Sequence, residues 1–249
     1  MKWEDLKVYK PLSKESLKPS FQEFVKLIGH KLEPHGFKNK GRKLLRLTND
    51  LIEVIDLDYR GSWSGQNEYF ETNLGLVPYC WLALVNEYYP IARREIKELD
   101  QSLKNHYRLT QEYELLADYL YRAIVKSGLP YFDKYNSTEK IVKRTADFKH
   151  KTLSGGNDIY NSHLLVLFSE LKQRTDKNAS KIIAQQIDYL EHLSIDLQNS
   201  KRNAELTETV AAWKSLQKTV QSKNWAVLNE QFDAFETQEL RKVGLRKSC

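Results

Sequence analysis

Cysteine is scarce in this sequence, whose 249 residues include only Cys80 and Cys249. Such a low content excludes a disulfide framework and a zinc site based on cysteine ligands. Long apolar runs are also missing, because the longest one, around Val77–Val85, is broken by Pro78 and is shorter than the roughly 18 residues that span a bilayer. The chain begins MKWED, which lacks the apolar segment of a signal peptide. We therefore expect a cytoplasmic protein with no membrane contact.

Motifs of common enzyme classes are absent as well. The six histidines include no pair with the spacing of a helical zinc site, and no Gly-x-Ser-x-Gly sequence provides a nucleophile elbow. The glycines of Gly61–Gly65 are not followed by the Lys-Ser/Thr pair of a phosphate-binding loop. The sequence therefore indicates no cofactor, no metal site and no catalytic residue, while a Ser-His-Asp arrangement of residues distant in sequence stays open.

Glycine and proline are unevenly distributed. Six of the ten glycines fall between Gly29 and Gly75, and no proline follows Pro130. Because both residues interrupt regular structure, this distribution predicts a turn-rich first third and a mostly helical remainder.

A first helix is predicted over Phe21–Leu32, where apolar residues recur at helical spacing. Pro19 suits the first turn of this helix, where its missing N–H removes no hydrogen bond. Pro34 and Gly36 would end it.

Strands are predicted next, over Arg42–Thr48, Leu51–Tyr59 and Glu68–Val77, and the Gly36–Gly41 segment is expected to start a strand or form a tight turn. Alternation in the second strand places Leu51, Glu53, Ile55, Leu57 and Tyr59 on one face, and Ile52, Val54, Asp56 and Asp58 on the other. The connections are short, which favours an antiparallel meander over parallel crossovers.

The period changes from Ile91 onward. We predict a charged helix over Ile91–Leu103, and a second helix with an apolar stripe over Tyr113–Ile124 that stops at Gly128 and Pro130. A further helix is predicted over residues 137–150.

The segment Ser154–Asn157 is the clearest linker in the chain. Beyond it, three apolar seams predict packed helices: Ile183, Ile187, Leu190 and Leu197; Leu206, Val210, Trp213, Leu216 and Val220; and Trp225, Leu228, Phe232 and Phe235. We therefore predict an α+β protein, with an N-terminal helix, an antiparallel sheet and packing helices in a domain over residues 1–153. An all-helical region over residues 157–249 follows.

Four segments resemble a known family: GFKNKGRKLLR over Gly36–Arg46, DLIEVI over Asp50–Ile55, FETNLGL over Phe70–Leu76 and LPYF over Leu129–Phe132. Together they resemble the bacterial domain-of-unknown-function family 4304, over about residues 20–150. The resemblance implies an N-terminal helix, an antiparallel sheet and following helices. It implies no activity, and it suggests an association with bacterial defence or toxin-immunity systems.

Charge is distributed asymmetrically within a net charge of +6, because residues 1–50 carry a net +6 and residues 51–100 a net -5. The basic run contains Lys38, Lys40, Arg42, Lys43 and Arg46, with Phe37 beside it. This run could hold phosphates while the aromatic ring stacks on a base. Its alternatives are a solvated edge hairpin, whose positive charge prevents strand-to-strand aggregation, and a site for an acidic protein partner.

Acidic residues gather on the two strands that follow: Glu53, Asp56, Asp58, Glu68 and Glu71. Clustered carboxylates can bind the divalent metals of a nuclease, but the acid-x-Lys sequence of a strand-type nuclease core is missing after Glu71. Cross-strand pairing of these acids with the basic strand Arg42–Arg46 is the favoured interpretation.

Many tyrosines lie between Tyr88 and Tyr135, where they could pack helices on the sheet with their hydroxyl groups at the rim. The alternative is a binding surface, since Tyr, Trp and Arg are frequent at protein interfaces. Trp63, in the loop Gly61–Gly65, either packs back onto the sheet or is exposed as a further candidate for contact with a partner. The leading hypothesis is a cytoplasmic, non-catalytic binding module for a protein partner, with nucleic-acid binding through the basic hairpin and metal-dependent hydrolysis as alternatives. The candidate binding residues are Phe37, Lys38, Lys40, Arg42, Lys43, Arg46 and Trp63.

Overall fold

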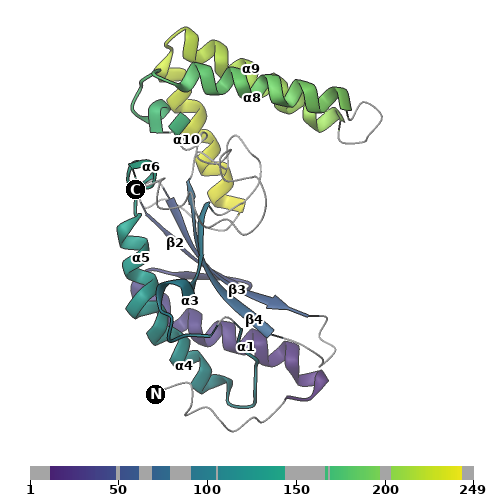
Figure 1. The fold of residues 1–249 in the computed structure, drawn as a ribbon, viewed down its shortest axis with the longest axis vertical. Coiled ribbons are helices and arrows are strands. Elements are labelled where there is room, and N and C mark those ends of the chain that lie inside the picture. Colours follow the sequence, from purple (N-terminus) through teal and green to yellow (C-terminus); the bar gives the residue numbers. More distant parts are fainter. Residues whose placement is uncertain are drawn as a thin grey trace. The chain divides into compact units, whose positions relative to one another are not determined.

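The computed structural model describes residues 12–48, 51–61, 69–78, 91–104, 106–143, 166–167, 169–196 and 203–242 (Figure 1). The described residues up to Ser137 form one compact unit, and those from Thr138 onward form a second. The predicted linker Ser154–Asn157 lies outside the described residues, so the domain boundary drawn there stays a prediction.

The first helix, α1, spans Lys14–Leu32 and is longer than the sequence predicted. Pro19 therefore lies inside the helix and not in its first turn, because the helix begins five residues earlier and Leu17 is buried with the rest of the apolar face. The end was predicted correctly: a short 3-10 helix, Glu33–His35, follows, and Gly36 takes a left-handed conformation with φ of 85°. A side chain at that angle would be strained, which explains the glycine.

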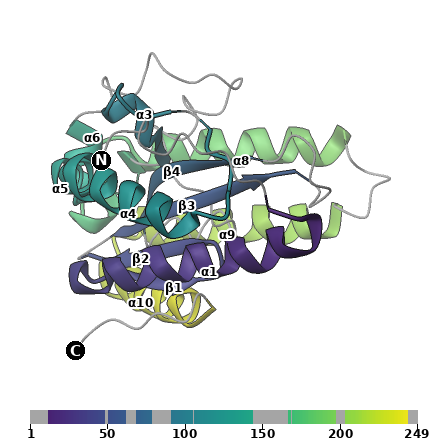
Figure 2. The same ribbon diagram turned by 90° about the horizontal axis from the view of Figure 1, so that it is seen from below.

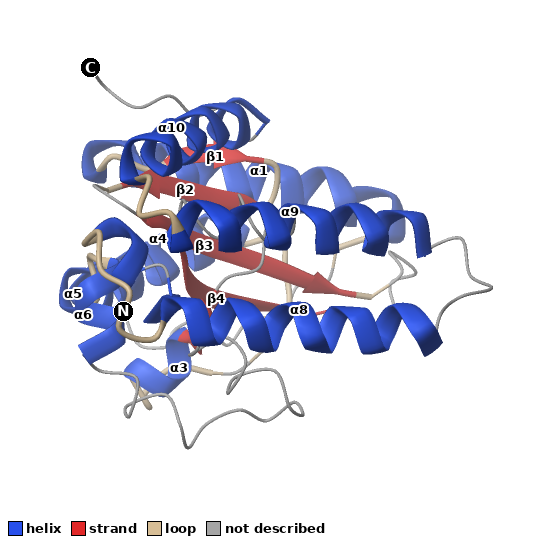
Figure 3. Cartoon of the chain, turned by 90° about the horizontal axis from the view of Figure 1, so that it is seen from above, coloured by secondary structure: helices blue, strands red, loops and turns tan. Residues whose placement is uncertain are grey.

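The first unit contains a five-stranded antiparallel sheet whose spatial order, β1-β2-β3-β4-β5, is the order of the chain. Its strands are β1 (Lys38–Lys40), β2 (Lys43–Leu47), β3 (Leu51–Arg60), β4 (Tyr69–Pro78) and β5 (Ile91–Glu95). Figure 3 shows the first four strands side by side in this order. The predicted α+β class and the antiparallel meander are therefore confirmed.

Two helices cover one face of the sheet (Figure 2). The ring of Phe24 on α1 lies 4.9 Å from that of Phe70 on β4. Gly29 lets α1 approach β2 closely, because a Cβ there would lie 3.2 Å from Leu44. The second helix, α4 (Tyr113–Ala123), adds Tyr119, whose ring lies 6.2 Å from Tyr107 beside β4. One apolar core of this unit therefore lies between the sheet and these helices. Leu45, Ile52, Val54 and Val77, on the other face of the sheet, are also buried.

The fifth strand corrects a prediction, since Ile91–Leu103 does not form one helix. Residues Ile91–Glu95 pair with β4, and only Ile96–Leu99 are helical, as α3. Pairing with the edge of β4 satisfies backbone groups that a helix would leave unpaired, and this long-range contact outweighs the local helical pattern.

The helix after α4 also differs from the prediction, because it does not stop at Gly128 and Pro130. A π-helical segment, Ile124–Gly128, leads directly into α5 (Leu129–Lys134). Pro130 lies in the first turn of α5, where its missing N–H is tolerated. Gly128 packs close to the sheet, since a Cβ there would lie 3.4 Å from Leu74.

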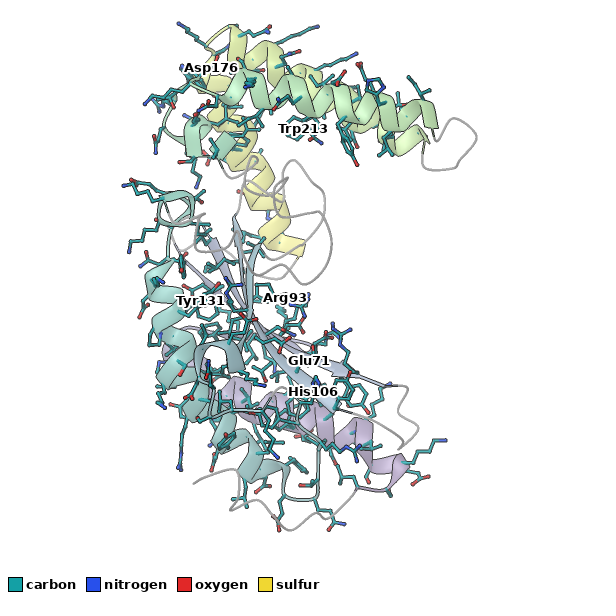
Figure 4. All side chains as sticks on the ribbon, viewed as in Figure 1. Glu71, Arg93, His106, Tyr131, Asp176 and Trp213 are labelled. Carbon is teal, nitrogen blue, oxygen red and sulfur yellow. The ribbon has the colours of Figure 1, made fainter. Side chains whose placement is uncertain are left out.

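The described part of the second unit forms the helices α6 (Thr138–Lys143), α8 (Ala179–Asp196), α9 (Asn203–Gln221) and α10 (Trp225–Lys242). The last three confirm the helical region predicted beyond residue 157, whereas α6 was predicted as a helix of the first domain. The predicted seams supply buried residues of the second unit, which include Ile183, Ile187 and Leu190 of α8, Trp213, Leu216 and Val220 of α9, and Leu228 and Phe232 of α10. Trp213, labelled in Figure 4, is the largest of the fully buried side chains described.

Candidate functional site

The register of the sheet separates its side chains onto two faces. Directly opposite residues of antiparallel strands point to the same side, and Asp56 lies opposite Lys43 on β2 and Asn73 on β4. Asp58 lies opposite Glu71 in the same way. These polar residues therefore share the face away from α1 and α4, as the alternation in the sequence predicted for Asp56 and Asp58.

Asp58 is the centre of an ion-pair network on this face. Its Oδ1 lies 2.9 Å from Nη1 of Arg42, and its Oδ2 lies 2.7 Å from Nη2 of Arg60. Nη2 of Arg93 lies farther from Oδ2, at 3.8 Å. One carboxylate on β3 thus holds three guanidinium groups that come from the β1–β2 turn, from β3 itself and from β5.

A tight turn places Arg42 over β3. Lys40 and Lys43 pair directly, so that Gly41 and Arg42 form a two-residue hairpin turn, and Gly41 has φ of 61°. A positive φ at the first turn residue is typical of the type II′ turn and favours glycine. The turn directs Arg42 to Asp56 as well, with 3.1 Å between Nε and Oδ1.

Burial raises the pKa of Asp56, and the positive charges of Arg42 and Lys43 oppose that rise.

Glu71 extends the network along β4. Arg60 bridges the two facing carboxylates, because its Nη2 lies 3.6 Å from Oε2 of Glu71 while it contacts Asp58. Without this cation, two like charges directly opposite each other would repel. The other carboxylate oxygen of Glu71, Oε1, lies 3.5 Å from Nδ1 of His106. The centre of the His106 ring lies 4.4 Å from that of the Tyr69 ring. Figure 4 shows Glu71, Arg93 and His106 along the same side of the strands.

The acids and the cations of this network lie at different depths. The side chains of Asp58 and Glu71 are 10% and 14% exposed, whereas those of Arg42, Arg60 and Arg93 are 43% to 48% exposed. The solvent therefore meets guanidinium groups, and the carboxylates lie beneath them. We call this surface, formed by Arg42, Arg60 and Arg93 above Asp56, Asp58 and Glu71, the arginine face.

Asn73 lies within the arginine face but takes no part in its ion pairs. It is 3% exposed, and neither its Oδ1 nor its Nδ2 has a hydrogen-bond partner among the described residues. Buried amide groups are nearly always hydrogen-bonded, and an unsatisfied one costs about 1–3 kcal/mol. Asn73 is therefore an exception that needs an explanation.

The structure distributes the predicted basic run over different environments. Arg46 and Phe37 face the helices: Arg46 pairs with Glu53, which is fully buried, and Phe37 is 1% exposed with its ring 5.9 Å from that of Phe132. The Phe37 ring is thus part of the core and presents no open surface to a base.

Lys38 and Lys40 lie on the exposed edge strand β1, and Lys43 is half-buried opposite Asp56. Trp63 lies outside the described residues, so its role as a binding residue stays a prediction.

Cross-strand pairing of the acids with Arg42–Arg46 was predicted, and it is confirmed for Glu53, Asp56 and Asp58. Glu71 pairs with Arg60 and His106 instead, and Glu68 lies outside the described residues. Sequence reasoning missed Arg60 and Arg93. The signal for Arg60 was present, since it continues the alternation of Asp56 and Asp58. Arg93 carried no such signal, because its segment was assigned to a helix.

Among the described residues, no three His, Cys, Asp or Glu side chains are grouped so that they could bind a metal ion. Of the helices described, none is both long and apolar enough to cross a bilayer. Comparisons of the chain with protein-family models, with curated proteins and with solved structures find no match. The resemblance to the domain-of-unknown-function family therefore stays a prediction.

Proposed function

We propose that this chain is a non-catalytic binding module that docks a partner protein through its arginine face. The supporting observation is the layered charge around Asp58, where three half-exposed guanidinium groups lie over one buried carboxylate. Each guanidinium carries five N–H donors in a fixed plane, and the carboxylates beneath use only some of them. The donors that point outward are held in place before any partner arrives, which reduces the entropy lost on binding.

An acidic protein surface fits this arrangement better than a nucleic-acid backbone does. The three arginines are matched by three carboxylates, so the network has little net charge and a weak long-range field. Nucleic-acid binding depends on that field, because each neutralised phosphate contributes to a strongly salt-dependent affinity. Bidentate contacts between an arginine and a carboxylate form at short range and do not need a long-range electrostatic field. A partner with Asp and Glu side chains would therefore be recognised at short range.

A nucleic-acid partner is the second candidate, and the exposed Lys38 and Lys40 on β1 favour it. Metal-dependent hydrolysis is not proposed, because guanidinium groups occupy the carboxylates of Asp56 and Asp58. The suggested link to bacterial defence rests on the family resemblance, and the structure adds no argument for it.

Charge reversal on the arginine face tests the proposal. Arg60→Glu and Arg122→Glu are matched variants, since both arginines are exposed but Arg122 lies on α4, away from the face. Cross-linking of the tagged chain in its host, followed by mass spectrometry, should join one partner to peptides that contain Arg60 or Arg93. We expect Arg60→Glu to lose this partner and Arg122→Glu to retain it. Retention by both variants, or cross-links confined to other surfaces, would contradict the proposal.

A further inference from the structure

Asn73 is the least satisfied side chain of the arginine face. Its amide offers one acceptor and two donors, and all three are unused among the described residues although the side chain is 3% exposed. The position is central, because Asn73 pairs with Asp56 on β3 and with Glu95 on β5. A hydrophobic side chain would lose no hydrogen bond here, so folding alone does not account for an asparagine.

Arg93 is the cation of the arginine face that comes from β5, the strand on the other side of Asn73 from Asp56. β5 pairs Glu95 with Asn73, and its register with β4 shifts between the Leu74–Arg94 and Leu76–Ile91 pairs, so Arg93 lies at this irregularity, two residues before Glu95. From there its guanidinium reaches toward Asp58, which lies on the far side of Asn73 on β3. To reach Asp58 on β3, the side chain of Arg93 crosses β4, on the face to which Asn73 belongs. At 3.8 Å, its contact with Asp58 is also the longest of the three arginine contacts.

The geometry points to Asn73 as a specificity-determining residue for an acidic peptide segment of the partner protein, reached when Arg93 turns outward. This inference rests on the proposed function of the arginine face. A carboxylate of the segment would draw Arg93 away from its long contact, since a bidentate pair is stronger than a single long one. The uncovered amide would then accept from a peptide N–H and donate to a peptide C=O. An extended segment presents both groups, and it also lies flat on a sheet surface.

The chain contains a matched control for Asn73. The adjacent residue, Thr72, is 2% exposed and its Oγ1 also has no hydrogen-bond partner among the described residues. Thr72 points to the opposite face, because successive residues of a strand alternate. Replacing either residue by valine removes an unsatisfied buried polar group, but only Asn73→Val changes the arginine face.

The test combines thermal unfolding with binding. Wild type, Asn73→Val, Thr72→Val and Arg60→Glu are offered an array of ten-residue peptides rich in Asp and Glu, together with single-stranded oligoadenylate. We expect both valine variants to melt at or above the temperature of the wild type, because each loses an unsatisfied polar group. We expect wild type and Thr72→Val to bind the same acidic peptides, and Asn73→Val to bind them at least tenfold more weakly.

The outcomes separate this inference from the proposed function. If Arg60→Glu abolishes peptide binding while Asn73→Val binds like wild type, the proposed binding role of the arginine face is supported and the proposed role of Asn73 is overturned. A lower melting temperature for Asn73→Val than for wild type would show that the amide is structural, which also overturns it. If the wild type binds oligoadenylate but none of the peptides, the inference of an acidic peptide ligand is overturned in favour of a nucleic-acid ligand. Wild type that binds no peptide would overturn both proposals.

Discussion

Arg46 on β2 donates from Nε to Oε2 of Glu53 on β3, and this ion pair lies on the helix-covered face of the sheet. The side chains are 20% and 1% exposed. Arg46 also donates from Nη1 to the carbonyl oxygen of His35 and lies 4.8 Å above the ring of Phe37. Arg42, only four residues earlier, joins the opposite face. The basic run is thus divided between a buried structural pair and the half-exposed ion-pair network of the arginine face.

The Arg46–Glu53 pair predicts a large cost for removing one partner. Burial raises the pKa of Glu53, and the hydrogen bond from Arg46 opposes the rise. Arg46→Met would leave a buried, unpaired carboxylate, and we expect a loss of about 3 kcal/mol in the free energy of unfolding at pH 7. Adding Glu53→Leu should recover most of that loss, because no charge is then buried. Urea denaturation of the single and double variants measures both effects.

The same variant has a defined pH dependence. Without Arg46, the pKa of Glu53 in the folded state lies further above its unfolded value, so the folded state binds a proton more readily. The loss in the free energy of unfolding caused by the unpaired Glu53 is therefore complete above the pKa that Glu53 has in the folded state. It disappears as the pH falls toward the ordinary pKa of a glutamate. We expect Arg46→Met to approach the wild type in stability as the pH is lowered from 7 to 5. A stability difference between Arg46→Met and wild type that stays constant from pH 7 to pH 5 would contradict the attribution of the loss to an unpaired, ionised Glu53.

Asp100 provides a pH test of opposite sign. The hydroxyl of Ser102 and then the ammonium group of Lys126, 2.9 Å away, lower the pKa of Asp100 from 3.8 to about 2. Because the folded pKa is depressed, its contribution to stability is present above pH 3.8 and is lost as the pH falls toward 2. We expect Asp100→Asn to lower the melting temperature at pH 7 and to differ less from wild type at each step below pH 4. Lys126→Gln, which keeps the Ser102 contact, should have the smaller effect.

Glu170 predicts a local effect in the second unit. Its Oε2 accepts hydrogen bonds from the backbone N–H groups of Asn178 and Ala179, at 2.7 and 2.9 Å, and its Oε1 accepts one from Nδ2 of Asn178 at 2.7 Å. These bonds cap the start of α8, where a negative charge also favours the helix dipole. We expect Glu170→Ala to cost about 2 kcal/mol and to speed hydrogen exchange in the first turn of α8.

Asp176 serves as the control for this cap. It binds the N–H and hydroxyl groups of Ser180 at the same end of α8, but in an exposed position. Water can replace those hydrogen bonds, so Asp176→Ala should have a smaller effect than Glu170→Ala. Equal losses for the two variants would show that burial of Glu170 adds nothing.

Local patterns in the sequence were sufficient for most elements of this fold. The alternation over Leu51–Tyr59 predicted which side chains share a face, because a strand has a period of two regardless of its partners. Gly36 marked the end of α1, since its positive φ is a requirement of the backbone itself. The apolar seams predicted the helices of the second unit for the same reason: each pattern records burial along its own element.

Only the tertiary structure decided the identity of β5 and the composition of the arginine face. A helical pattern over Ile91–Leu103 could not show that the edge of β4 would pair with part of it. Arg42, Arg60 and Arg93 meet at Asp58 because three segments come together in one register, and a shift of one residue would turn β3 over and separate them. The sequence by itself therefore determined what each segment buries, whereas pairing between distant segments determined which charges meet.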